Sequence, residues 1–242
     1  MSRTQSIFLT AEWRDLLMLN YELEPSLVQN YIPRGTELDF FGGKTYISLV
    51  GFLFCHTKLR GRLSIPFHSQ FEEINLRFYV RRSSGGETRR GVVFIAEIVP
   101  KLAIAKTARW VYGENYVCRR MKHRVPAEGK GNVVEYGWKK DADWCALKAC
   151  IGGNSSLPAE GSLQQFITEH YWGYSAQENG GTLEYRVDHI PWRVWTASDA
   201  EFTGNPAPLY SEDFARVLMR PPDSALVAEG SPVSVHDGNS VS

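Results

Sequence analysis

The stretch FEEINLRFYV at residues 71–80 decides the fold, because apolar and polar side chains alternate along it. Ile74, Leu76 and Phe78 share one face of an extended chain, and the polar residues between them share the other. Alternation with a period of two is typical of a β-strand with one buried face. The polar residues of the second face are Glu73, Asn75 and Arg77. The pattern predicts a strand over residues 73–81 that carries an acid, an amide and a guanidinium on one side.

Further strand patterns recur along the chain, separated by short turns rich in Gly, Ser and Asn. They cover residues 45–55, 91–99, 132–138, 146–151 and 182–189. Helical patterns are few and short: residues 24–31, residues 105–112, a helix capped by Ser162 with Gln165 three residues later, and residues 211–218. We therefore expect an α+β, β-dominated fold with a curved or closed sheet, in one domain over residues 5–230. The Ser- and Gly-containing end, residues 231–242, is expected to be a flexible tail.

The composition excludes several classes of partner. Lys and Arg together number 27, and so do Asp and Glu, so no basic excess favours a nucleic-acid partner. No stretch approaches 18 consecutive apolar residues, and the longest run has only strand length, so we expect no membrane span. The N-terminus lacks the pattern of a secretory signal, which favours a cytoplasmic protein.

Metal and cofactor motifs are also missing from the sequence. The 4 Cys form no C-x-x-C pair, and none of the 6 His stand three or four residues apart. Neither glycine-rich phosphate loop occurs. We expect no metal and no cofactor, and a small molecule as the partner; whether the chain forms a homo-oligomer stays open.

The polar face of residues 73–77 has two interpretations. On an open sheet it faces solvent, whereas in a closed barrel it lines the lumen. A lumen would raise the pKa of Glu73 and make it a candidate general acid or base. Arg77 and His68, which lies just before the strand, would then be candidate ligand-binding residues.

A second candidate is Arg14, which precedes the apolar run LLML at residues 16–19. Its planar guanidinium could hold a substrate carboxylate through two hydrogen bonds, or it could form a salt bridge to a neighbouring acid such as Asp15. The segment 162–192 is dense in aromatic, His and acidic residues and would suit a pocket wall, with Glu169 and His170 as its polar anchors. A packed aromatic core is the alternative there.

Taken together, several stretches resemble the YqjF-like family of bacterial proteins, over nearly the whole chain. They are FLTAEWR (8–14), YIPRGTEL (31–38), YISLVGF (46–52), FEEINLRFYV (71–80), GVVF (91–94), VEYGW (134–138) and FITEHYWGY (166–174). That family is distantly similar to acetoacetate decarboxylase. The resemblance implies a cone-like, largely antiparallel β-barrel with a buried pocket.

The decarboxylase uses a Schiff-base lysine with an arginine and glutamates around the substrate. By resemblance, Arg14 matches the arginine and Glu73 matches one pocket glutamate, while the second glutamate falls near Leu49 or Val50 and is lost. Tyr116 stands about where the Schiff-base lysine is expected, and a tyrosine cannot form a Schiff base.

Three hypotheses follow for the function. The first is a barrel that binds a small anionic or carbonyl-bearing molecule, with Glu73 and Tyr116 supplying acid/base chemistry without a lysine. The second is a ligand-binding or sensor module without catalysis. The third is a decarboxylase-like lyase that uses a relocated lysine, Lys106 or Lys122.

Overall fold

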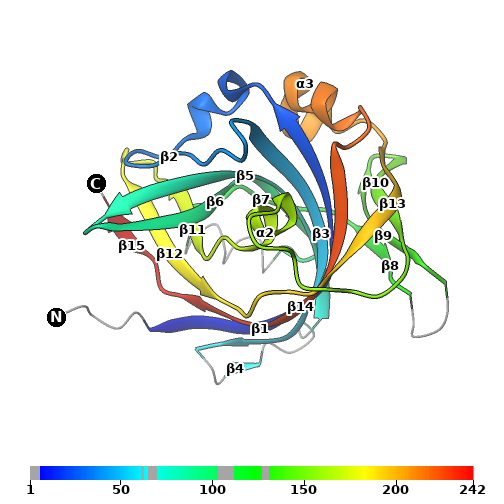
Figure 1. The fold of residues 1–242 in the computed structure, drawn as a ribbon, viewed down its shortest axis with the longest axis horizontal. Helices are drawn as coiled ribbons and strands as arrows, with labels where there is room; N and C mark the ends of the chain where they lie inside the picture. Colours follow the sequence, from blue (N-terminus) through cyan, green and yellow to red (C-terminus); the bar gives the residue numbers. More distant parts are fainter. Residues whose placement is uncertain (1–5, 61–62, 65–69, 103–111, 127–130, 242) are drawn as a thin grey trace.

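The computed structural model describes residues 6–60, 63–64, 70–102, 112–126 and 131–241 (Figure 1). Strands dominate it, as the sequence predicts. The strands are β1 (Ile7–Leu23), β2 (Glu37–Leu38), β3 (Thr45–Leu59), β4 (Leu63–Ser64), β5 (Gln70–Ser84), β6 (Glu87–Val99), β7 (Tyr116–Cys118), β8 (Met121–Arg124), β9 (Val133–Lys140), β10 (Asp143–Ile151), β11 (Trp172–Ala176), β12 (Thr182–Asp188), β13 (Val194–Thr203), β14 (Ser224–His236) and β15 (Asn239–Val241). The described helices are α2 (Leu163–Thr168) and α3 (Ala207–Leu218).

Seven of these strands close into a cone-like barrel. The path runs β12–β11–β6–β5–β3–β1–β14, and β14 then pairs back with β12. All pairs of this ring are antiparallel except β11 with β6. Because side chains alternate across each strand, every strand of the ring sends one set inward and the other outward.

The outward set packs beneath a second layer of strands. Strands β13, β10, β9 and β8 continue from β14 and lie beside the barrel in Figure 1. The outward side chains Ile74, Leu76 and Phe78 belong to the core between these two layers. Gly51 of β3 permits the close approach, since a Cβ there would overlap the Tyr136 side chain of β9.

The short helices follow the predictions in part. Ser162 caps α2 by accepting a hydrogen bond from the backbone N–H of Gln165, as predicted. Residues 24–31 form two 3-10 turns, Pro25–Leu27 and Gln29–Tyr31, rather than one helix, and no side chain caps either turn. The predicted helix at 211–218 begins earlier, at Ala207, with a kink at Ser211. The predicted helix at 105–112 lies almost wholly outside the described residues.

The expected flexible tail is instead part of the sheet. Residues 231–236 continue strand β14, which pairs with β1 and closes the barrel on β12. Val233 and Val235 are buried, although the segment as a whole is polar in composition. The expectation fails because backbone pairing on both sides of β14 holds this polar strand in place. No described helix is long and apolar enough to cross a lipid bilayer.

Candidate functional site

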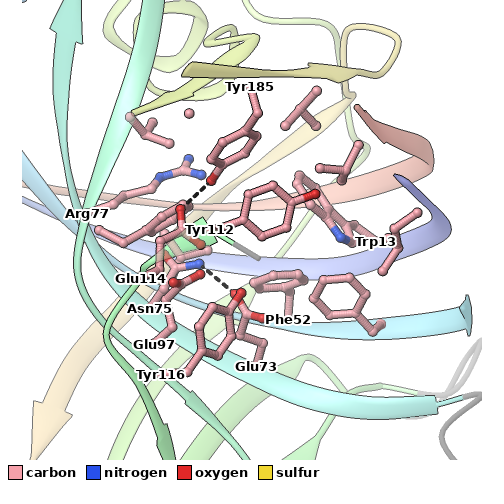
Figure 2. Close-up of a pocket in the computed structure, with 18 of the residues that line it drawn as sticks. Trp13, Phe52, Glu73, Asn75, Arg77, Glu97, Tyr112, Glu114, Tyr116 and Tyr185 are labelled. Atoms are coloured by element: carbon pink, nitrogen blue, oxygen red, sulfur yellow. Dashed lines mark hydrogen bonds between the residues drawn. The ribbon is translucent and has the colours of Figure 1, made fainter. Parts of the chain in front are cut away.

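The barrel holds a cavity of about 400 Å³, lined mainly by inward-facing side chains of the ring, with Tyr112, Glu114, Tyr116 and His170 added from outside the ring strands. Four successive inward positions of β5 contribute Phe71, Glu73, Asn75 and Arg77. The polar face of this strand therefore lines a lumen, and the solvent-facing interpretation is wrong. Figure 2 shows the polar groups gathered at one side of the cavity and the rings of Phe52 and Trp13 at the other.

Three carboxyl groups share this cavity: Glu73, Glu97 and Glu114, all at most 7% exposed. The amide of Asn75 donates to Oε1 of Glu73 over 3.2 Å. The hydroxyl of Tyr185 donates to Oε1 of Glu114 over 2.5 Å. Glu97 and Glu114 are close enough that each affects the pKa of the other.

Burial raises the pKa of all three carboxyl groups, because a charged carboxylate loses its hydration in the cavity wall. The pKa of Glu73 rises to about 8 and that of Glu114 to about 7. The pKa of Glu97 rises well above its usual value, mainly by burial and further through the charges of Glu114 and Glu73. Near neutral pH the cavity therefore holds mostly neutral carboxylic acids, with Glu114 the first to ionise.

Arg77 is the buried cation of this cavity, with 9% of its surface exposed. Its Nη2 donates to the carbonyl oxygen of Ile167 over 3.2 Å, and lies 3.9 Å from the sulfur of Met18. Its Nε has no hydrogen-bond partner, and no described acid forms an ion pair with it. Burying a guanidinium without a hydrogen-bonded carboxylate costs free energy.

Unpaired buried polar atoms concentrate around the same cavity. Within the described part of the chain, eight buried side-chain polar atoms lack a partner, and six of these belong to residues that line the cavity. The six are Trp13 Nε1, Thr57 Oγ1, Asn75 Oδ1, Arg77 Nε, Glu97 Oε2 and His170 Nδ1. Buried polar groups are nearly always paired in folded proteins, so this concentration marks a place where a ligand or water completes the bonding.

His170 forms a second polar arrangement at the wall. Its Nε2 lies 3.2 Å from Oδ2 of Asp39, which also accepts a hydrogen bond from Nε of Arg90 over 2.6 Å. Burial lowers the pKa of His170 to about 4, so the ring is neutral. Burial alone would raise the pKa of Asp39, but the hydrogen bonds from His170 and Arg90 outweigh it and lower that pKa. The neutral ring donates to Asp39 through Nε2 and therefore has Nδ1 as a free acceptor.

Helix α2 covers the cavity at the Arg77 end. Phe166 and Ile167 belong to the apolar cluster inside the barrel, and the carbonyl of Ile167 accepts the hydrogen bond from Arg77. Phe166 also contacts the rings of Tyr79 and His170. The arginine is thus held beneath a helix, on the inner side of the barrel.

The fold brings together four of the residues predicted from sequence: Glu73, Arg77, Tyr116 and His170 line one cavity. Tyr116 is buried, and burial raises its pKa well above the usual value, so its hydroxyl is a neutral donor. His68 and Lys106 lie outside the described residues.

Arg14 does not reach the cavity, contrary to the prediction. Its side chain is 39% exposed and pairs with Glu12 at 2.6 Å on the outer face of β1. The neighbouring Trp13 points inward instead. A break in the register after Arg14, with Asp15 at a φ of 54°, shifts the phase so that Leu16 also points inward. This β-bulge reverses the face that simple alternation assigns to Arg14.

Two further residues predicted for the site, Glu169 and Lys122, lie outside it. The side chain of Glu169 accepts a hydrogen bond from Gln165 within α2 and is not part of the cavity wall. Lys122 lies on the outer strand β8 and forms an ion pair with Glu135 at 2.8 Å, so it cannot serve as a relocated Schiff-base lysine.

Sequence reasoning missed two of the three carboxyl groups. Glu97 is the only charged residue in the run VVFIAEIV at residues 92–99, which was an available signal. A register break of β6 against β5 turns both Phe94 and Glu97 inward, three residues apart. Glu114 precedes β7 in a segment without a pattern, and nothing in its surroundings marks it.

The closed, cone-like sheet around a cavity is the fold of acetoacetate decarboxylase-like proteins. Solved structures with this fold superpose over nearly the whole chain, at low sequence identity. The acetoacetate decarboxylase of Legionella pneumophila has a TM-score of 0.69 at 13% identity, covering 100% of this chain and 92% of its own. The enduracididine biosynthesis enzyme MppR, complexed with pyruvate, has a TM-score of 0.70 at 13% identity, with the same coverage.

The chain belongs to the DUF2071 family, described as an uncharacterized conserved protein, whose model matches residues 10–232. A relative in Bacillus subtilis (strain 168), the uncharacterized protein YqjF, is 27% identical over 197 residues. That alignment covers 80% of this chain and 77% of the relative. The resemblance inferred from the sequence motifs is thereby confirmed, for the family and for the fold.

Proposed function

We propose that the barrel cavity binds a small organic acid that carries a carbonyl group, and that its buried carboxyl groups move a proton on that ligand. The observation that supports this most directly is Arg77, a buried guanidinium without a described ion-pair partner in a cavity lined by other unpaired polar atoms. A ligand carboxylate would give the guanidinium the charge-assisted bonds that the protein does not supply.

The electrostatics of the cavity favour an anionic ligand near neutral pH. The raised pKa values keep Glu73 and Glu97 protonated, so Arg77 contributes positive charge that they do not cancel. The low polarity of the surrounding wall strengthens the attraction between the guanidinium and a carboxylate. Neutral carboxylic acids can in turn donate hydrogen bonds to a ligand carbonyl oxygen.

The chemistry that suits this arrangement is proton transfer next to a carbonyl group. An ionised Glu114 can accept a proton from the carbon beside the carbonyl, while a protonated Glu73 or Glu97 donates a hydrogen bond, and then its proton, to the carbonyl oxygen. The product is the enol, and the return of both protons restores the ketone. Tyr116 is a neutral donor in the same wall and can hold the oxygen.

The fold relatives support a carbonyl-bearing ligand, since one of them is a complex with pyruvate. The described residues that line the cavity include no lysine, which favours acid/base chemistry over a Schiff base here. A non-catalytic binding module with the same ligand differs only in the absence of turnover.

The test combines binding and proton exchange. Calorimetry measures the affinity for pyruvate and acetoacetate, and proton NMR in D₂O measures exchange at the carbon beside their ketone. We expect Arg77→Gln to weaken binding by at least about tenfold, consistent with the loss of one charged hydrogen bond. Glu73→Gln should slow exchange while binding persists.

The matched controls are Arg14→Gln and Glu169→Gln, which remove the same groups outside the cavity and should leave binding and exchange unchanged. Binding without exchange in the wild-type protein would favour the binding module. An Arg77→Gln variant that folds and binds these acids as tightly as the wild type would contradict the proposal. Borohydride trapping of a lysine adduct would instead support the lyase hypothesis.

A further inference from the structure

Along strand β5, the side chains that line the cavity change from charged to aromatic. On β5 the inward residues run in order Arg77, Asn75, Glu73 and Phe71, that is cation, amide, acid and phenyl ring. Successive inward positions are two residues apart, so this series spans roughly 20 Å along the strand, at about 3.3 Å per residue. Along this strand, the chemical character of the cavity wall therefore changes with distance from Arg77.

The neighbouring strands repeat only the aromatic end of this series. On β3, Phe54 pairs with Phe71, and Trp13 of β1 pairs with Phe54. At the heights of Asn75 and Glu73, β3 presents Val50 and Phe52, so the polar side chains there do not come from β3. The register therefore gathers aromatic rings from three strands at the end of β5 that lies away from Arg77.

The aromatic end is a built surface of packed rings. Phe54 stacks on Phe71 with ring centroids 4.8 Å apart, and Trp13 meets Phe52 and Phe54 edge-on at 5.5 and 5.8 Å. All four rings line the cavity, and the indole N–H of Trp13 has no partner. Such a surface binds an apolar or aromatic group, and the free N–H can point at the face or an acceptor atom of that group.

We propose that the physiological ligand is an elongated acid: a carboxylate at Arg77, a carbonyl or hydroxyl group beside the carboxyl cluster, and an aromatic or branched apolar tail among Trp13, Phe52, Phe54 and Phe71. This inference rests on the proposed function and narrows its substrate class. A keto acid as small as pyruvate or acetoacetate can reach the charged end or the aromatic end, but not both, given the length of the graded wall.

The test compares pyruvate with phenylpyruvate, which differ only by the aromatic group. Burying a phenyl ring contributes enough free energy that we expect phenylpyruvate to bind at least about tenfold more tightly in calorimetry. Phenylacetone, which has the ring and ketone but no carboxylate, should bind more weakly than phenylpyruvate. Equal affinities for pyruvate and phenylpyruvate would overturn the inference.

Two conservative variants localise the tail. Phe54→Leu and Phe71→Leu should reduce the affinity for phenylpyruvate several-fold and leave that for pyruvate nearly unchanged. Phe41→Leu is the matched control, because Phe41 packs on Tyr46 and Phe166 and is not part of the cavity wall. Equal losses for both ligands in the Phe54 and Phe71 variants would contradict the proposed placement of the tail.

The failure of this inference can be told apart from failure of the proposed function. If both acids bind equally and Arg77→Gln weakens both, the cavity is an acid-binding site without a tail pocket. If Arg77→Gln changes neither affinity, or neither acid binds the wild-type protein, the proposed function fails and the inference fails with it.

Discussion

At the scale of single residues, burial disfavours the charged form of the Glu73 carboxyl group. In the folded protein its pKa is about 8, against 4.5 in the reference state. Between these values the unfolded chain has released a proton that the folded chain retains, so stability falls as pH rises. The contribution of this group is intact below about pH 4.5 and is lost as pH rises through about 8.

We therefore expect Glu73→Gln to flatten the pH dependence of stability. The amide mimics the protonated acid and cannot ionise, so the variant should gain on the wild type by roughly 1 kcal/mol for each pH unit above about 4.5, up to about pH 8. Urea unfolding over this pH range measures the effect. Glu169→Gln, which changes a side chain outside the cavity, should keep the wild-type slope of unfolding free energy against pH. If Glu73→Gln gives that same slope, Glu73 ionises in the folded protein as it does in the unfolded chain.

Ligand affinity should also depend on pH at this scale. Glu114 and Glu73, whose pKa values are about 7 and about 8, become negative as pH rises and then compete with the ligand carboxylate for Arg77. The affinity for phenylpyruvate should therefore fall above neutral pH, and Glu73→Gln should move this fall to a different pH or reduce it. Calorimetry across neutral to alkaline pH checks this, and an affinity that rises with pH would contradict it.

At the scale of elements, a glycine in β11 makes room for a polar side chain of the site. Gly173 pairs with Tyr185 of β12, and a Cβ at Gly173 would overlap the Tyr185 ring. The hydroxyl of that ring donates a hydrogen bond to Glu114. Strand pairing thus positions the ring, and the glycine allows it to lie flat across β11.

We expect Gly173→Ala to displace the Tyr185 ring and to weaken the binding of phenylpyruvate. Gly51→Ala is the matched control: its Cβ would strike Tyr136 outside the barrel, so it should lower stability without a specific loss of binding. Thermal unfolding and calorimetry separate the two effects. If Gly173→Ala binds phenylpyruvate as tightly as the wild type, binding does not depend on the present position of the Tyr185 ring.

The sequence predicts an element well where alternation is unbroken. Along β5 the period of two runs from Phe71 to Val80, and it placed Glu73 and Arg77 on one face correctly. The wrong prediction for Arg14 and the missed Glu97 both lie at β-bulges, which change the phase within a strand. The bulge in β1 turns Arg14 outward and the one in β6 turns Glu97 inward. Bulges leave no alternating signal, so sequence reasoning could not locate them.

Residues supplied by loops were beyond prediction for a different reason. Glu114 reaches the cavity because β7 pairs in parallel with β6, which places Tyr116 beside Glu97. That contact is a property of the tertiary fold. The family resemblance implied the barrel and the cavity, whereas only the structure shows that Arg77, and not Arg14, lines the cavity.

At the scale of the whole molecule, the barrel depends on its last long strand. β14 joins β1 on one side and β12 on the other, and a contact of 2.7 Å between His236 and Asp188 lies at this seam. Removing residues 231–242 should abolish cooperative unfolding, because the ring loses its seam and several buried side chains.

The matched truncation removes only residues 239–242, which contain β15 and lie outside the ring. It should retain a cooperative transition, with a modest loss of stability. Circular dichroism during thermal unfolding compares the two truncated chains. A cooperative transition in the shorter chain would show that the barrel closes without the end of β14.

The seam in β14 also has a consequence for biosynthesis. Strand β1 is synthesised well before its partner β14, with some two hundred positions between their paired residues Leu17 and Val227. Until β14 has left the ribosome, one edge of β1 therefore lacks its partner, and the nascent chain exposes an unpaired apolar strand. The barrel cannot close, and the ligand chamber cannot form, before β14 has been made.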